Sequence, residues 1–300
     1  MRQSWCNKLS ERFRGWLYHC SLLSLLFYCL GRLIPGGTQS DWQTIVRFSK
    51  RLLLLYGFWC VVWSPIVYIQ KDYLHDFSLL SIVLLVRDFF FGSIFDASWF
   101  LGALLVGVPL VWLLVKVLGK RLFWVIPFVI HLYVMYEKYL PAEFLAVSNW
   151  YKDNVCEDGM WLSFPSGLLW ISIGYLLSNN KTVETFSKWN NKYVWLVSLA
   201  AIILVFCKVP LVSILAVVLL FIAAYTWHLP EHPALYKRLR TYSILFYVIH
   251  DCFKKIPKQL FGMENGPVLF VITIAFCFIA SEFIMRMKDV KGFGWLKYAY

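Results

Sequence analysis

Residues 98–118 read SWFLGALLVGVPLVWLLVKVL, and Lys116 is the one charged residue in this run. A membrane-spanning helix needs about 20 predominantly apolar residues, because lipid offers no water to satisfy an open backbone. The run therefore predicts a transmembrane helix, and the neighbouring sequence has the same character.

Apolar runs of this kind fill most of the 300 residues. Together they predict an all-α, polytopic integral membrane helix bundle with about nine transmembrane helices. The predicted spans are 16–34, 51–69, 98–118, 122–139, 161–177, 193–209, 211–228, 240–254 and 266–285. The loops between them are too short for a separate soluble domain, so residues 1–300 are expected to form a single membrane-embedded domain.

One further apolar segment, Phe77–Phe95, is interrupted in its middle by Arg87 and Asp88. A charged pair is costly at the centre of a bilayer. The segment therefore predicts an interfacial or re-entrant helix rather than a tenth span.

Composition supports the same class. Hydrophobic residues make up 60% of the chain and charged residues 15%, against about 25% charged in soluble domains. The net charge is +12, but most basic residues lie between apolar runs, so they predict topology signals and contacts with anionic membrane lipid rather than a nucleic-acid partner. The eight cysteines include no CxxC pair, and no His/Glu set has metal-ligand spacing, so neither a disulfide framework nor a metal is expected.

Loop charges predict the orientation. The turn Gly119-Lys120-Arg121 and the tail after residue 285 are basic, whereas loop 140–160 carries Glu143, Asp153, Glu157 and Asp158 against one lysine. Because basic loops stay cytoplasmic, the C-terminus is predicted inside and loop 140–160 outside.

Two basic sets fall on the outer side in this topology. They are Lys254, Lys255 and Lys258, and the N-terminal Arg2, Lys8, Arg12 and Arg14. The N-terminal set predicts that a further helix precedes residue 1.

His250 is the leading candidate for chemistry, because an ionisable group at membrane depth is costly unless it has a function. The alternative is a neutral histidine that is hydrogen-bonded to a neighbouring helix. Tyr247 lies three residues earlier on the same helix face. Asp251 points about 100° away and is not expected to orient His250 directly. For His131, a satisfied core position is favoured over a ligand role.

Charged residues near the ends of two spans have two explanations each. Arg47, Lys50 and Arg51 place three cations within five residues, which could hold phosphates; a positive-inside anchor is the ordinary alternative. Glu282, near the end of the last predicted span, is expected to pair with a basic residue.

Four segments carry a family resemblance. They are FSKRLLLLYGFW at 48–59, SWFLGAL at 98–104, FPSGLLWISIGY at 164–175 and RTYSILFYVIH at 240–250. In order and spacing they resemble the acyltransferase-3 family of polytopic membrane acyltransferases, many of which O-acetylate bacterial surface glycans.

The resemblance implies a site. An acetyl group would pass from acetyl-CoA at the cytoplasmic face of the bacterial inner membrane to a hydroxyl of a glycan or lipid-linked sugar. His250 and Tyr247 would line the central cavity, and Arg47, Lys50 and Arg51 would face the phosphates of CoA.

The family's first helix carries an Arg and, about ten residues later, a catalytic His, whereas residues 16–34 resemble the family's second helix. His19 would then be a substitute base, and the chain alone is expected to transfer acyl groups poorly or not at all.

Three other classes compete with this interpretation. A transporter or flippase of a lipid-linked or small substrate would also need polar residues within the membrane, but would not depend on acyl-CoA. A glycan polymerase is disfavoured, because loop 140–160 contains no arginine. An inactive relative that only assembles with partners is the third.

Overall fold

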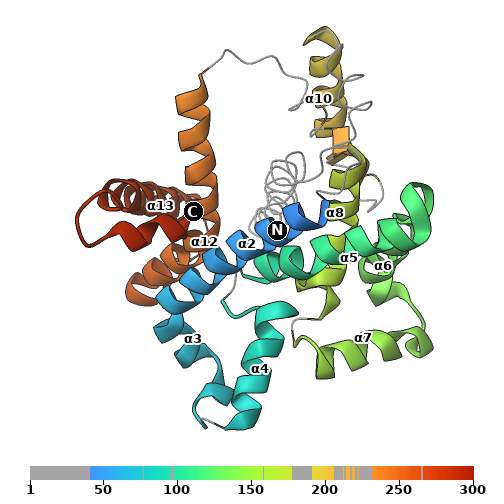
Figure 1. The fold of residues 1–300 in the computed structure, drawn as a ribbon, viewed down its shortest axis with the longest axis horizontal. Coiled ribbons are helices and arrows are strands. Elements are labelled where there is room, and N and C mark those ends of the chain that lie inside the picture. The colour runs from blue at the N-terminus through green and yellow to red at the C-terminus, as the bar shows by residue number, and fades with distance from the viewer. Residues whose placement is uncertain are drawn as a thin grey trace. The chain divides into compact units, whose positions relative to one another are not determined.

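The computed structural model describes residues 41–76, 78–95, 98–157, 159–177, 191–205, 232–264 and 266–300, together with positions 212, 214–216, 218–219 and 222. Over these residues the chain forms helices and contains no β-strand (Figure 1). The predicted all-α class is therefore confirmed. The predicted span 16–34 lies outside the described residues, as does most of 211–228.

The helices are, in chain order, α2 (Asp41–Val62), α3 (Ser64–Gln70), η1 (Asp72–Leu74), α4 (Leu79–Phe90), α5 (Trp99–Leu122), α6 (Val125–Tyr136), η2 (Glu137–Tyr139), α7 (Ala142–Asn154), η3 (Met160–Leu162), α8 (Phe164–Leu177), α10 (Asn191–Val205), α12 (Pro233–Phe261), α13 (Pro267–Met287) and η4 (Gly294–Ala299).

Among the described residues, α5 and α13 are each long and apolar enough to cross a membrane, and α2 with α3 makes a third candidate if the bent pair is one span. Many apolar side chains of α13 are exposed, including Val271 and Ile279. Water would penalise such a surface, whereas lipid matches it. The apolar helices thus point to a membrane protein.

The predicted number of nine spans is not confirmed. The helices α6 and α8 are apolar but have 12 and 14 residues, about 18–21 Å at 1.5 Å per residue. That is short of a hydrocarbon core of about 30 Å. The 29-residue α12 is long enough, but charged residues such as Arg240 and Lys255 keep it from qualifying as a span by composition.

The predicted span 51–69 is broken. The helices α2 and α3 meet at Trp63 at an angle of 69°. Pro65 explains the break, because it lacks an N–H and its ring clashes with the carbonyl four residues earlier, that of Val61. The hydroxyl of Ser64 donates to this carbonyl at 2.8 Å and satisfies it.

Three shorter segments can be compared with the sequence-based predictions: the one with Arg87 and Asp88, the loop 140–160 and the turn at Gly119. The segment with Arg87 and Asp88 forms α4, whose 12 residues are too few to cross a bilayer, as predicted. Loop 140–160 was expected to be a connection, but it is mostly the helix α7. The turn at Gly119 is present, and its φ of 75° is a conformation that favours glycine.

The chain separates into two compact units. One comprises Ser49–Leu105, Asn149–Phe164 and Glu231–Tyr300, and we call it the α12 unit; the other includes Val106–Ser148 and 165–177, and we call it the α8 unit.

Within the α12 unit, α12 and α13 form an antiparallel pair joined through Gly262, which has the left-handed conformation typical of a helix end. Tyr242 stacks on Phe278 with ring centroids 4.9 Å apart, and Phe253 stacks on Phe276 at 5.8 Å.

The C-terminal η4 is attached to α2 in the same unit. The indole N–H of Trp59 donates to the carbonyl of Ala299 at 3.0 Å, and both residues are buried. The fully buried Tyr56 stacks on Phe89 of α4 with ring centroids 4.1 Å apart. These contacts, each worth about 1 kcal/mol, hold α2, α4 and η4 together.

In the α8 unit, α8 is nearly all buried and packs closely against α5. A Cβ added to Gly107 would lie 2.5 Å from the side chain of Ile171. Phe123 and Tyr175 make a second contact, edge to face, at 5.2 Å.

Candidate functional site

The ring of His250 is held by the backbone of its own helix. Its Nδ1 lies 2.8 Å from the carbonyl oxygen of Tyr247 and 3.0 Å from that of Phe246. A carbonyl only accepts hydrogen bonds, so Nδ1 carries the hydrogen. Nε2 is then the nitrogen at which His250 can gain or lose a proton.

Asp251 lies beside that nitrogen, which corrects the expectation that it would be too far around the helix. Its Oδ1 is 3.5 Å from Nε2 of His250. Neighbouring side chains do leave a helix about 100° apart. Because Nδ1 of His250 turns back to the backbone, the opposite edge of the ring faces the carboxylate. The two residues form an imidazole–carboxylate pair, with side chains 28% and 15% exposed.

Tyr247 is placed against aromatic neighbours in the same unit. Its ring lies edge to face against Phe100 at 5.5 Å and 6.3 Å from the ring of His250. The structure thus brings Tyr247 and His250 together, as the helix spacing predicted.

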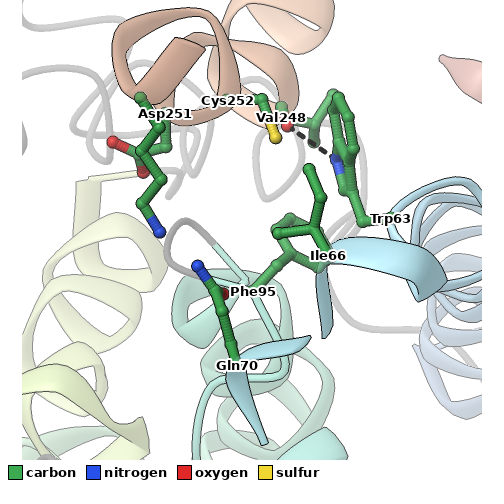
Figure 2. Close-up of a pocket in the computed structure, with 8 residues that line it drawn as sticks. Trp63, Ile66, Gln70, Phe95, Val248, Asp251 and Cys252 are labelled. Carbon is green, nitrogen blue, oxygen red and sulfur yellow. Dashed lines mark hydrogen bonds between the residues drawn. The ribbon is translucent and has the colours of Figure 1, made fainter. Parts of the chain in front are cut away.

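A small pocket opens next to this pair, with Asp251 and Cys252 in its lining (Figure 2). Its other lining residues are Trp63, Ile66, Gln70, Phe95, Val248 and Lys255. His250 and Tyr247 are not among the residues that line this pocket, and their place at a central cavity stays a prediction.

Two hydrogen-bonded supports shape the pocket wall. The indole N–H of Trp63, at the α2–α3 break, donates to the carbonyl of Val248 at 3.2 Å, the dashed line in Figure 2. Phe95 is buried, and the hydroxyl of Ser98 accepts its backbone N–H at 3.1 Å. The aromatic side of the pocket is consequently fixed by the helix break and by the turn before α5.

The three predicted phosphate-binding cations, Arg47, Lys50 and Arg51, are all exposed on the first turns of α2. Arg51 precedes the pocket residue Trp63 by 12 positions, which is about 18 Å along a helix. Arg51 is therefore about three helical turns away from the pocket wall along the chain.

Asp88 is the centre of a polar cluster of which only some members could be predicted from the sequence. The carboxylate is 2% exposed and accepts hydrogen bonds from Lys71 at 2.8 Å, from the Tyr73 hydroxyl at 3.0 Å and from Arg87 at 2.8 and 3.0 Å. The Arg87-Asp88 pair was visible in the sequence. Lys71 and Tyr73 lie 15 to 17 residues away, and no helical period connects them to Asp88.

The electrostatics of this cluster keep Tyr73 protonated and Arg87 charged, so that both donate hydrogen bonds to Asp88. Burial and the negative charge of Asp88 raise the pKa of Tyr73 above its ordinary value, so the phenol stays protonated and donates to Asp88. Burial alone would lower the pKa of Arg87, but its hydrogen bonds to Asp88 and the charge of Asp88 raise it. The cluster is fully satisfied, which fits a structural role.

The remaining candidates divide clearly. His131 is 1% exposed and packs edge to face on Trp170 at 5.7 Å, in agreement with a core position, although its buried Nδ1 has no hydrogen-bond partner among the described residues. Glu282 pairs with Arg238 and Arg286, as expected, and also accepts from the Tyr242 hydroxyl. His19 lies outside the described residues.

Comparisons with known proteins leave the family open, since no family model, curated protein or solved structure matches the chain. Among the described residues, no group of three or more His, Cys, Asp or Glu side chains is placed to hold a metal ion. The site must therefore be interpreted from its own geometry.

The sequence could have pointed to part of the pocket. Asp251 and Lys255 stand four residues apart with opposite charge, a spacing that puts both on one helix face. Trp63 and Gln70 gave no such signal, because only the bend at Pro65 turns α3 so that both residues line the pocket.

Proposed function

We propose that this chain is a membrane acyltransferase that moves an acyl group, most simply acetyl, from acyl-CoA to a hydroxyl of a surface glycan or lipid-linked sugar. The observation that carries the proposal is the His250–Asp251 pair beside a pocket: Nδ1 of His250 is fixed by two carbonyls, and its Nε2 faces the Asp251 carboxylate. The resemblance to the acyltransferase-3 family supports the same reaction.

The reaction needs a proton acceptor near the attacking hydroxyl. The hydroxyl oxygen attacks the thioester carbonyl, a C–O bond forms and the C–S bond breaks. The hydroxyl proton passes to the His250–Asp251 pair, and the CoA thiolate leaves and is protonated. Tyr247, against the ring of His250, would help to fix its orientation.

The donor would be held by its phosphates at Arg47, Lys50 and Arg51, whose exposed side chains are free to reach a multiply anionic ligand. The roughly 18 Å along α2 between Arg51 and the pocket suits the long pantetheine arm that separates the phosphates of CoA from its thioester. In this arrangement the CoA phosphates stay near one membrane face and the acceptor arrives at the other.

The location proposed is the bacterial inner membrane, with a cytoplasmic C-terminus and segment 140–160 outside. Reporter fusions after Asn149 and Tyr300 test this orientation, and an external reporter at Tyr300 would contradict it.

The activity is tested with labelled acetyl-CoA and membranes that contain this chain and surface glycan, and is measured against membranes without the chain, because the resemblance predicts a low rate for the chain alone. His250→Ala should reduce transfer about 10²–10⁴-fold, the usual loss for a general base. Replacing Arg47, Lys50 and Arg51 by Gln should instead raise the KM for acetyl-CoA. Lys116→Gln, which removes a cation elsewhere, is the control. Transfer that survives both changes would contradict the proposal.

A transporter or flippase remains the second candidate, and the break between α2 and α3 favours it, because transporters bind substrates at discontinuous helices. Substrate flux without acyl-CoA, retained in His250→Ala, would select this alternative.

A further inference from the structure

The pocket beside His250 combines an apolar wall with polar groups at its other side. Trp63, Ile66, Phe95 and Val248 form the wall. Asp251, Lys255 and Gln70 supply one charged acceptor and two donors, and Gln70 and Cys252 project toward the open space in Figure 2. Such a mixture suits a neutral polar group better than an ion, since the charges of Asp251 and Lys255 offset each other.

Its size limits what can enter. The cavity volume is about 20 Å³, and about 10–15 Å³ is needed for one water molecule. One hydroxyl group fits inside, whereas a sugar ring does not, and a thioester can meet that hydroxyl only at the mouth of the pocket. A larger ligand could therefore insert only a single hydroxyl and would keep its remaining atoms outside.

The proposed orientation puts the pocket on the side where an acceptor would arrive. Its residues come from the C-terminal half of α12, from α3 with Trp63 before it, and from Phe95 before α5. Lys254, Lys255 and Lys258 follow directly, the set that the positive-inside pattern leaves on the outer face. Lys255 lines the pocket, so at least one of these three lysines contributes to a site on the outer side.

We infer that this pocket receives the acceptor hydroxyl and that Asp251, rather than His250, is the residue that touches it; the inference rests on the proposed acyl transfer. Asp251 accepts the hydrogen bond of the hydroxyl and passes the proton to Nε2 of His250, 3.5 Å away. As that proton leaves, the hydroxyl oxygen bonds to the acyl carbon and the thiolate is expelled. His250 is then the proton store behind Asp251.

Cys252 allows binding to be measured without any acyl transfer. It lines the pocket, is not part of a disulfide and is partly exposed. A full-length chain that keeps Cys252 and carries serine at the other seven cysteines is labelled with a small methanethiosulfonate in detergent. Glycerol should slow labelling by a factor of 1 + [L]/Kd, about threefold at twice its Kd. The trimethyl ether of glycerol (1,2,3-trimethoxypropane), which has no hydroxyl, should not slow the labelling.

The variants assign the effect to a residue. Asp251→Ala should raise the Kd of glycerol, obtained from this protection, about tenfold or more, because a hydrogen bond to a charged acceptor is lost. Asp251→Asn, nearly the same shape, should show an intermediate loss and guards against misfolding. The exposed Asp72→Ala is the matched control and should leave protection unchanged.

Three results would overturn the inference: Cys252 that does not react, equal protection by glycerol and its trimethyl ether, or unchanged protection in both Asp251 variants. Failure of the proposed function looks different. Glycerol protection that depends on Asp251, without any acetyl transfer, would remove the acyltransferase proposal and leave a hydroxyl site. Acetyl transfer at the wild-type rate in Asp251→Ala would remove the role of Asp251 at the acceptor hydroxyl and leave the acyltransferase proposal standing.

Discussion

Replacing Asp88 by Asn should destabilise the α12 unit strongly, and the geometry of the cluster sets the magnitude. The carboxylate receives four hydrogen bonds of 2.8–3.0 Å, three of them from the cations Lys71 and Arg87. Asparagine keeps one acceptor oxygen but turns an NH₂ group toward these donors. The variant therefore leaves two cations close together without the negative charge between them.

Breaking a buried ion pair from one side costs about 3–5 kcal/mol. The side chains of Lys71 and Arg87 are 19% and 16% exposed, and water partly solvates them. We therefore expect the lower part of that range, about 3 kcal/mol. At about 2–4 °C per kcal/mol, the melting temperature should fall by roughly 6–12 °C.

The measurement is thermal unfolding of the purified chain in detergent, followed by circular dichroism. Asp72→Asn makes the same change at an exposed position of η1, one residue from Lys71, and should melt like the wild type. Lys71→Gln combined with Asp88→Asn should cost less than the sum of the two single changes, because the partners are coupled. If Asp88→Asn melts together with Asp72→Asn, the cluster does not stabilise the unit.

Three further outcomes are expected. His250→Ala should abolish most acetyl transfer, while His131→Ala should lower thermal stability and leave the rate per folded molecule unchanged; equal near-wild-type transfer by both would remove His250 from the site. The pKa of Tyr73 is raised in the folded chain, so its hydrogen bond to Asp88 stabilises the fold fully below pH 10 and is lost as the pH rises above that value. As the pH is raised above 10, the melting temperature of Tyr73→Phe should therefore fall less than that of the wild type. Gly102→Ala should cost about 1–2 kcal/mol in unfolding experiments, because the new Cβ would lie 3.0 Å from the backbone oxygen of Phe89, whereas Gly57→Ala meets nothing within 4 Å and should be neutral or stabilising; equal behaviour of the two would show that α5 can shift.

The proposed roles divide the proton transfer between His250 and Asp251, whereas the resemblance implied a histidine base on the family's first helix, with His19 as its substitute. A base whose Nδ1 is fixed by the backbone can accept a proton only at Nε2, and Asp251 stands between that atom and the pocket. The orientation of the His250 ring is set within α12, because the carbonyls of Tyr247 and Phe246 in the preceding turn bind its Nδ1.

The sequence by itself determined the class of this protein. Long apolar runs have one stable backbone solution in lipid, the helix, so residues such as 98–118 predict their own secondary structure without any knowledge of neighbours. The charged pair at Arg87 and Asp88 excluded a span for the same reason. Helical spacing also placed Tyr247 next to His250, because residues three apart share a face.

Only the tertiary structure decided which residues meet across the chain. Asp88 is joined by Lys71 and Tyr73 because η1 folds back onto α4, and a contact of this kind has no period in the sequence. The bend at Pro65 brings Trp63, Ile66 and Gln70 to the pocket beside Asp251. Local patterns report what a segment can form by itself, whereas a site depends on the angles between segments, and those angles are set by long-range packing and by single residues such as Pro65.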